Sequence, residues 1–274
     1  MKKIKNVISV LSLAFMMLVS LSVNSQSIFT EYENLGNIHN DFLDNVENNF
    51  IPTDEEDYDK KINLITEFNL NFINKTNLKS DEKENLAEAV RDFRYNTNSV
   101  EFYNNSFDSK NGVYKQLDEL KSKKIIDDFS YNELLSLYKA SERRESVSEL
   151  ISLVDAIKNR ANLHYNGKNT SESRLLAIII QISSSSFDWW NKNQIRYNKN
   201  SGGQQAVNEE LALLAPWVAA DAIGAAISAG VAATAQYATT GEVGNWGAVG
   251  ISALGGAVTA STGVVGKLVK WFGW

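Results

Sequence analysis

Cysteine is absent from the 274-residue chain, and proline and histidine occur only twice each. Without cysteine the protein can form no disulfide, carry no lipid on an N-terminal cysteine and use no cysteine nucleophile. The two histidines, His39 and His164, are too few to supply a histidine-rich metal site. Stability must therefore come from the burial of apolar side chains.

Basic residues are also in deficit. Once Lys2, Lys3 and Lys5 are set aside as part of a leader segment, 24 basic residues face 33 acidic ones, which leaves a net charge of −9. Nucleic-acid phosphates are bound by clustered lysine and arginine, so this balance argues against a nucleic-acid partner. It also argues against electrostatic recruitment of the protein body to anionic lipid.

The first 25 residues have the form of a secretory signal peptide. Three lysines precede an apolar run from Val7 to Val23, and the polar sequence Asn24-Ser25-Gln26-Ser27 follows it. This arrangement predicts export and cleavage, and so a protein of the periplasm, the cell envelope or the medium. The alternative is a transmembrane anchor, because the run is close to the length that a bilayer requires.

Residues 26–200 read as a domain of amphipathic helices. Apolar residues recur there at spacings of three and four. Capping patterns predict helix starts at Thr53, Ser80 and Ser130, and further helices are expected over 146–162 and from about Thr170. The last of these carries Ile178-Ile179-Ile180, apolar on too many sides for a surface helix, and we place it at the centre of the core. The four serines 183–186 are expected to weaken it.

A composition change after residue 200 predicts a second unit. The polar stretch 191–205 reads as a linker region, and we place the linker between the two units at residues 201–210. Residues 211–274 are rich in alanine and glycine with only four charged residues. Two apolar stretches, 211–235 and 247–269, flank a polar turn near Thr239 to Glu242, and each exceeds the roughly 20 residues that span a bilayer as a helix. The predicted fold is all-α, a helical bundle followed by an antiparallel helical hairpin.

Small residues recur every four positions in both stretches and would let two helices approach closely. The positions assigned to hairpin packing are Gly224, Ser228, Gly230, Ser252, Gly255, Gly256, Ala260 and Gly263. This part of the chain resembles glycine-zipper hairpins.

Aromatic and basic residues at the two ends of the hairpin suggest anchoring at membrane interfaces. One end would hold Trp217, Lys267, Lys270, Trp271 and Trp274, and the other Tyr237 and Trp246. Insertion is energetically marginal, because Asp221 could cost about 3 kcal/mol at a bilayer centre, close to the apolar gain of its stretch. Asp221 lies one turn inside Trp217, so we expect it near one end of the span, where the cost is smaller. The alternative is a hairpin packed in water beneath the helical domain, with small residues simply permitting close contact.

A short motif lies near the start of the predicted mature chain. Gly36, His39, Asn40, Leu43 and Asp44 form the pattern G-x-x-H-N-x-x-L-D. It resembles the opening motif of a set of uncharacterised secreted bacterial helical proteins, and that resemblance implies a shared helical start but no activity. His39 is read as a core or capping residue, since Asp44 does not share its helix face.

No catalytic template is recognisable, neither G-x-S-x-G nor H-E-x-x-H nor a phosphate-binding glycine loop. The sequence therefore predicts a non-enzymatic protein without cofactor or metal, with membrane lipid as its partner. The leading hypothesis is an exported, bacteriocin-like or pore-forming effector that uses the hairpin. The alternative is an envelope-anchored structural or protein-binding module, tethered by the hairpin or self-associating through it.

Overall fold

The computed structural model describes residues 27–92, 112–143, 145–199 and 204–262, and the predicted signal peptide lies outside them. Within these ranges all regular structure is helical, which confirms the all-α prediction. The elements are the 3-10 turn η1 (Thr30–Tyr32) and the α-helices α2 (Glu33–Asn49), α3 (Tyr58–Lys75), α4 (Ser80–Asp92), α6 (Val113–Ser122), α7 (Asp128–Glu142), α8 (Val147–His164), α9 (Ser171–Lys199), α10 (Gln204–Thr240) and α11 (Trp246–Thr262).

Two of the expected helix starts are wrong by a few residues. Helix α3 is capped by Asp57, whose carboxylate accepts from the backbone N–H of Lys60, and not by Thr53. Helix α7 is likewise capped by Asp127, and Ser130 is a buried residue inside its first turn. In both cases an aspartate close to the predicted serine or threonine is an equally good acceptor and takes the capping position.

Other helix predictions are confirmed. Helix α8 starts at the capping box formed by Ser146 and Glu149, and α4 begins at Ser80. Helix α9 contains Ile178 to Ile180, all almost fully buried. The serine run does not interrupt α9, which continues to Lys199; the Ser183 hydroxyl donates to the Ile179 carbonyl within the helix. The polar stretch predicted as a linker is thus largely helical.

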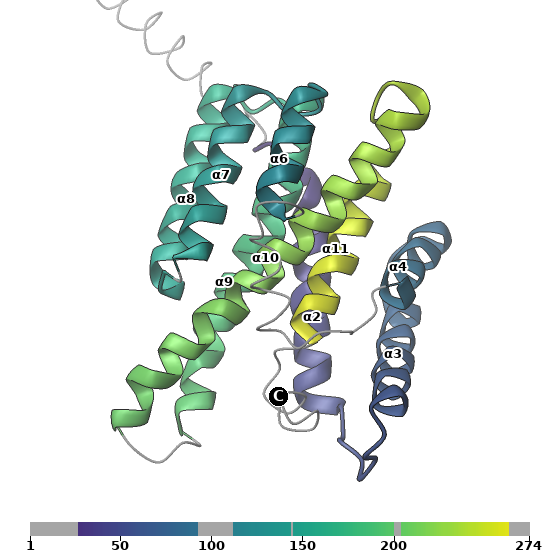
Figure 1. The fold of residues 1–274 in the computed structure, drawn as a ribbon, viewed down its shortest axis with the longest axis vertical. Helices are drawn as coiled ribbons and strands as arrows, with labels where there is room; N and C mark the ends of the chain where they lie inside the picture. Colours follow the sequence, from purple (N-terminus) through teal and green to yellow (C-terminus); the bar gives the residue numbers. More distant parts are fainter. Residues whose placement is uncertain (1–26, 93–111, 144, 200–203, 263–274) are drawn as a thin grey trace, which may run out of the picture.

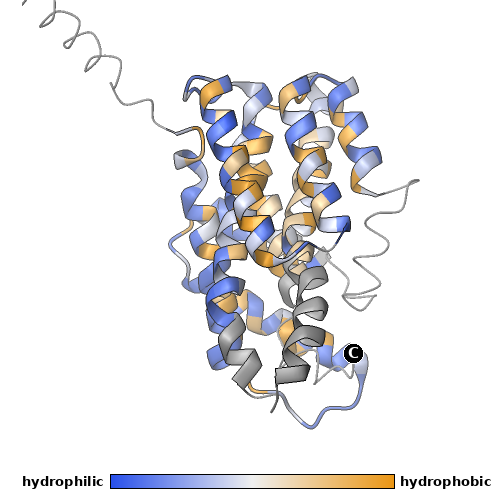
Figure 2. Cartoon of the chain, turned by 90° about the vertical axis from the view of Figure 1, so that its left-hand side faces the viewer, coloured by the Kyte–Doolittle hydropathy of each residue, from blue (hydrophilic) through white to orange (hydrophobic). Residues whose placement is uncertain are grey.

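The helices form one bundle with the hairpin inside it. Helices α10 and α11 lie between α6–α8 on one side and α3–α4 on the other (Figure 1). Helix α11 contacts α2, α4 and α9, and α10 contacts α6, α7 and α9. Apolar residues gather in the interior and polar residues on the outer faces of the surrounding helices (Figure 2). A single hydrophobic core therefore includes residues from both sides of the predicted linker.

The two hairpin helices run antiparallel. Gly224 of α10 lies against Gly256 of α11, and nearer the turn the Gln236 amide bonds to the backbone of Asn245. Gly241 occupies the left-handed region with φ of 81°, which lets the chain reverse directly after α10. The turn thus falls where the polar break in the sequence predicts it.

Among the helices that the structure describes, none is both long and apolar enough to cross a membrane. The predicted spans reach beyond what is described: the side chains of 211–218 and all of 263–269 lie outside it.

Candidate functional site

The hairpin interface is built on backbone contact between α10 and α11. A Cβ atom placed on Gly256 would lie 2.1 Å from the Gly224 carbonyl oxygen and 2.2 Å from Ser228 Oγ. One placed on Gly224 would lie 2.4 Å from the Gly256 oxygen and 2.8 Å from Ala260 Cβ. Real Cβ atoms do not approach so closely, so these positions require the small residues that the sequence pattern singled out.

Gly230 does not belong to this interface. Its missing Cβ would lie 2.4 Å from Cδ of Gln116 on α6, and the Gln116 amide donates to the Ile227 carbonyl of α10 at 2.9 Å. The prediction that Gly230 packs within the hairpin is therefore wrong. The absence of a side chain at Gly230 leaves room for the Gln116 side chain of the covering helix α6. The remaining assigned positions, Ser252 and Gly255, are half-buried and buried, and Gly263 lies outside the described residues.

The expected interfacial anchors are only partly visible. Tyr237 and Trp246 lie at the turn end of the hairpin, where they line one cavity of about 250 Å³ together with Lys123 and Lys124. The side chain of Trp217 and all of Lys267, Lys270, Trp271 and Trp274 lie outside the described part of the chain.

The G-x-x-H-N-x-x-L-D motif joins α2 to α9. A Cβ on Gly36 would lie 2.1 Å from Ser185 Oγ, so glycine is needed for the two helices to touch there. The Asn40 amide donates to the Ser185 carbonyl at 2.9 Å, and the Trp189 indole donates to Asp44 at 2.9 Å. Leu43 is fully buried between these polar contacts. Each of these motif residues has a contact that fixes α2 in position.

The motif histidine reaches further, to the hairpin itself. His39 Nε2 lies 3.6 Å from Oδ2 of Asp221 on α10, and both side chains are 0% exposed. The same carboxylate oxygen accepts hydrogen bonds from Ser186 Oγ at 2.6 Å and from the Trp190 indole at 3.0 Å, both on α9. Three helices, α2, α9 and α10, therefore meet at one buried carboxylate, which we call the Asp221 joint and define by His39, Ser186, Trp190 and Asp221.

Burial governs the electrostatics of the Asp221 joint. Desolvation lowers the pKa of His39, while the negative charge of Asp221 and a hydrogen bond with Asn40 act in the opposite direction. A buried carboxylate is tolerated because hydrogen-bond donors surround it. All four side chains are fully buried, so the joint is closed to solutes in this conformation and serves to hold α10 against α2 and α9.

Sequence reasoning read His39 as a core or capping residue; the structure places it in the core, and the sequence did not identify its partner. Asp221 was expected near one end of a hypothetical span, and the structure places it in the protein core. The sequence does indicate that Asp221 has a polar partner, because a single acid inside a long apolar stretch needs one wherever the stretch is buried. Nothing in the sequence identifies that partner as a motif nearly two hundred positions earlier.

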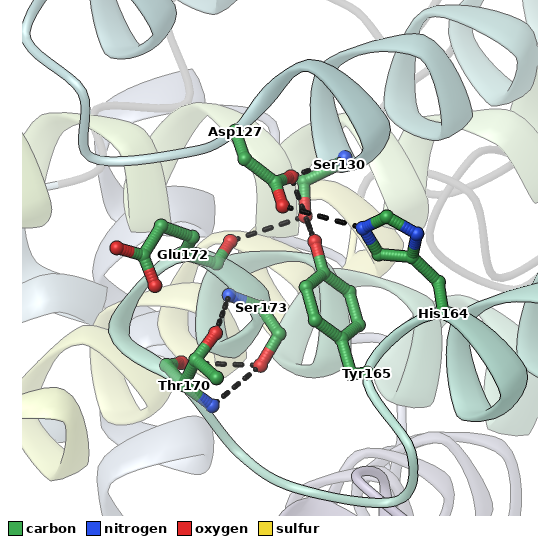
Figure 3. Close-up of polar contacts among 7 residues, drawn as sticks. All are labelled: Asp127, Ser130, His164, Tyr165, Thr170, Glu172 and Ser173. Carbon is green, nitrogen blue, oxygen red and sulfur yellow. Dashed lines mark hydrogen bonds and ion pairs between the residues drawn. The ribbon is translucent and has the colours of Figure 1, made fainter.

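A second polar cluster ties the far ends of three helices together (Figure 3). The Tyr165 hydroxyl donates to Asp127 at 2.7 Å and lies 2.7 Å from Ser130 Oγ, which also donates to the Glu172 carbonyl. His164 approaches Asp127 at 3.7 Å. Nearby, Thr170 and Ser173 cap the start of α9 reciprocally. The hydroxyls of Ser130 and Tyr165 are hydrogen-bonded within this network, which holds the ends of α7, α8 and α9 together.

Among the described residues no group of three or more histidine and acidic side chains is arranged to hold a metal ion. Comparison of the chain with protein-family models, with curated proteins and with solved structures found no match. The assignment of function therefore rests on the geometry of the hairpin and its joint.

Proposed function

We propose that this is an exported, membrane-active protein of bacteriocin-like or pore-forming type, in which the bundle stores the α10–α11 hairpin until contact with a membrane. The observation that supports this most directly is the Asp221 joint. It holds an otherwise uncharged segment of α10 against α2 and α9 through buried contacts of His39, Ser186 and Trp190 with one carboxylate.

The composition of the hairpin supports the same proposal. Apart from Asp221 and Trp246, its buried described residues are small or aliphatic, among them Ile223, Ala226, Leu254 and Ala257, all at most 1% exposed. A hydrocarbon phase offers such residues an environment as apolar as the protein interior, so transfer to lipid costs them little. The internal hairpin contact at Gly224 and Gly256 involves no covering helix and can persist in either environment. Transfer must break the joint and the hydrogen bond from the Gln116 amide of α6 to the Ile227 carbonyl.

The alternative is an envelope tether that keeps the hairpin permanently in lipid. That arrangement would remove α10 and α11 from the core and leave apolar faces of α2, α4 and α9 without cover. Burial of apolar area contributes roughly 25 cal/mol per Å², so loss of this cover would be expensive for the helical domain. The observed packing favours storage over a permanent tether.

A reversible cross-link between the hairpin and the covering helices tests the proposal. Gln116→Cys with Gly230→Cys places two thiols where a side chain of α6 already touches α10, in a protein that has no other cysteine. Oxidation should lock α10 to α6 and abolish dye leakage from liposomes of phosphatidylglycerol and phosphatidylethanolamine. Dithiothreitol should restore leakage to the level of the unmodified protein.

Each single-cysteine variant is the matched control and should leak dye with or without oxidant. Equal leakage from the oxidised and reduced double variant would show that the hairpin need not leave the bundle. Absence of leakage by the unmodified protein at every lipid composition and pH would contradict the effector proposal, and firm membrane retention without leakage would support the tether.

A further inference from the structure

A cavity that lies away from the hairpin is the candidate for a second site. It has a volume of about 560 Å³ and opens where the segment before α2 crosses α8 and α9. Ligand pockets for small molecules commonly have volumes of this order. The segment is held there by Asn162, whose side-chain oxygen accepts from Ser27 Oγ and from the backbone N–H of Ile28, both at 3.1 Å.

Side chains of both charge signs line this cleft. Glu33 and Asp155 supply two carboxylates, and Lys158 supplies an ammonium group between α8 and α9. Lys158 Nζ donates to Ser184 Oγ at 2.6 Å and lies 5.9 Å from the Phe29 ring centroid. Burial lowers the pKa of Lys158, and the charges of Asp155, Asp188 and Glu33 oppose that shift. An ammonium group has three N–H donors, so the bond to Ser184 leaves two for a ligand.

Four other polar side chains of the cleft have donors or acceptors available for a ligand. The side chains of Glu33, Asp155, Asn159 and Gln181 line the cleft and make no hydrogen bond or salt bridge with other described residues. The cleft thus presents uncommitted carboxylates and amides around a fixed ammonium group. This contrasts with the Asp221 joint and the Asp127 cluster, where polar groups bind one another.

We propose that this cleft binds a small zwitterion, a free α-amino acid or a dipeptide, with the ligand carboxylate on Lys158 and the ligand ammonium group on Asp155 or Glu33. A simple anion would meet the two carboxylates, and a simple cation would meet the lysine. A ligand with both charges satisfies both sites, and charge-assisted hydrogen bonds are the stronger kind. The amides of Asn159 and Gln181 can pair with a peptide group between the two charges.

The test compares three probes: one carries both charges, and each of the other two lacks one of them. Alanyl-alanine carries both charges, N-acetyl-alanyl-alanine lacks the ammonium group, and alanyl-alanine amide lacks the carboxylate. Titration of the full mature chain by calorimetry should show binding of alanyl-alanine and at least about tenfold weaker binding of the other two, since loss of one charged hydrogen bond costs about 1.5–3 kcal/mol. The free amino acid alanine is titrated alongside to distinguish a monomer site from a dipeptide site.

Lys158→Met and Asp155→Asn should each weaken binding of alanyl-alanine about tenfold or more. Lys115→Met, at an exposed lysine of α6, is the matched control and should bind as the unmodified protein does. Asp155 is exposed, so its variant keeps the fold even if Lys158→Met does not. Equal binding of all three probes, no binding of alanine or alanyl-alanine, or preferential binding of an uncharged sugar such as glucose would overturn the proposal. None of these outcomes depends on membrane activity.

Discussion

At the scale of single residues, the core contains a fully buried histidine whose pKa is lowered by burial. His39 lies against the Asp221 carboxylate with no access to water, and burial is the largest influence on its pKa, which falls below the usual value of about 6.5. In the unfolded chain the same imidazole regains its ordinary pKa. The pKa of His39 therefore differs between the folded and the unfolded protein.

The direction of the resulting pH dependence follows from proton linkage. Below about pH 6.5 the unfolded chain takes up a proton at residue 39 that the folded protein does not bind. The free energy of unfolding should fall by up to about 1.4 kcal/mol per pH unit below about pH 6.5, until the folded-state pKa is reached, and should be independent of His39 above about pH 7.5. Urea unfolding between about pH 7.5 and 5.5 measures this slope.

His39→Gln should flatten the slope, and His164→Gln is the matched control at the only other histidine. His164 is 46% exposed, so the slope should survive its replacement. A slope unchanged by His39→Gln would show that the pH dependence arises elsewhere, in the carboxylates.

At the scale of helices, the glycines of the hairpin differ in what surrounds them. Gly256 faces the backbone oxygen of Gly224, which cannot move unless the helices separate, whereas Gly230 faces the flexible end of the Gln116 side chain. Gly244, in the turn, is open: a Cβ there would meet nothing within 4 Å beyond its neighbours in the chain. Three glycines in one hairpin thus provide a graded series.

Alanine at these three positions should destabilise the protein in the order of the obstruction. Gly256→Ala should lower the free energy of unfolding by about 1–3 kcal/mol, as overpacking of a rigid contact does. Gly230→Ala should cost less, because Gln116 can turn aside, and Gly244→Ala should stay within about 0.5 kcal/mol of the unmodified protein. Denaturant midpoints measure all three, and equal effects at Gly256 and Gly244 would contradict the close packing of α10 on α11.

The same comparison shows how far sequence reaches at this scale. The four-residue spacing of small residues predicts that α10 and α11 approach closely, because helical periodicity fixes which side chains share a face. The spacing does not distinguish Gly230, which lies against the Gln116 side chain of α6, from Gly224, which lies against the backbone of Gly256 in α11. The prediction of helix starts is limited in a similar way. Asp57 and Thr53 are both suitable N-cap residues, and the sequence alone does not show that α3 is capped by Asp57.

At the scale of the whole molecule, the hairpin and the preceding helices share one core. Composition predicts a boundary at 201–210, since the change from polar to alanine-rich sequence is abrupt. The structure joins the two sides at the Asp221 joint and along α4, α6 and α9. Composition records what each segment can bury but not against which helices it packs, so from the sequence a hairpin packed beneath the helical domain is only the alternative.

A shared core predicts cooperative unfolding. The mature protein should show a single calorimetric transition, with the van't Hoff enthalpy equal to the calorimetric enthalpy, because loss of α10 and α11 removes buried partners from the other helices. Truncation after residue 205 should abolish that transition. Two resolved transitions, or a truncated chain that still melts cooperatively, would restore the two-domain division predicted from composition.

The contact between His39 and Asp221 also bears on how related chains would be recognised. An uncompensated acid in the core is costly, so a chain that changes one of these two residues is under pressure to change the other. The opening G-x-x-H-N-x-x-L-D pattern and a lone acid in a distant apolar helix thus constitute one bipartite signature. A search for the two together would select chains that share this architecture more sharply than either half can.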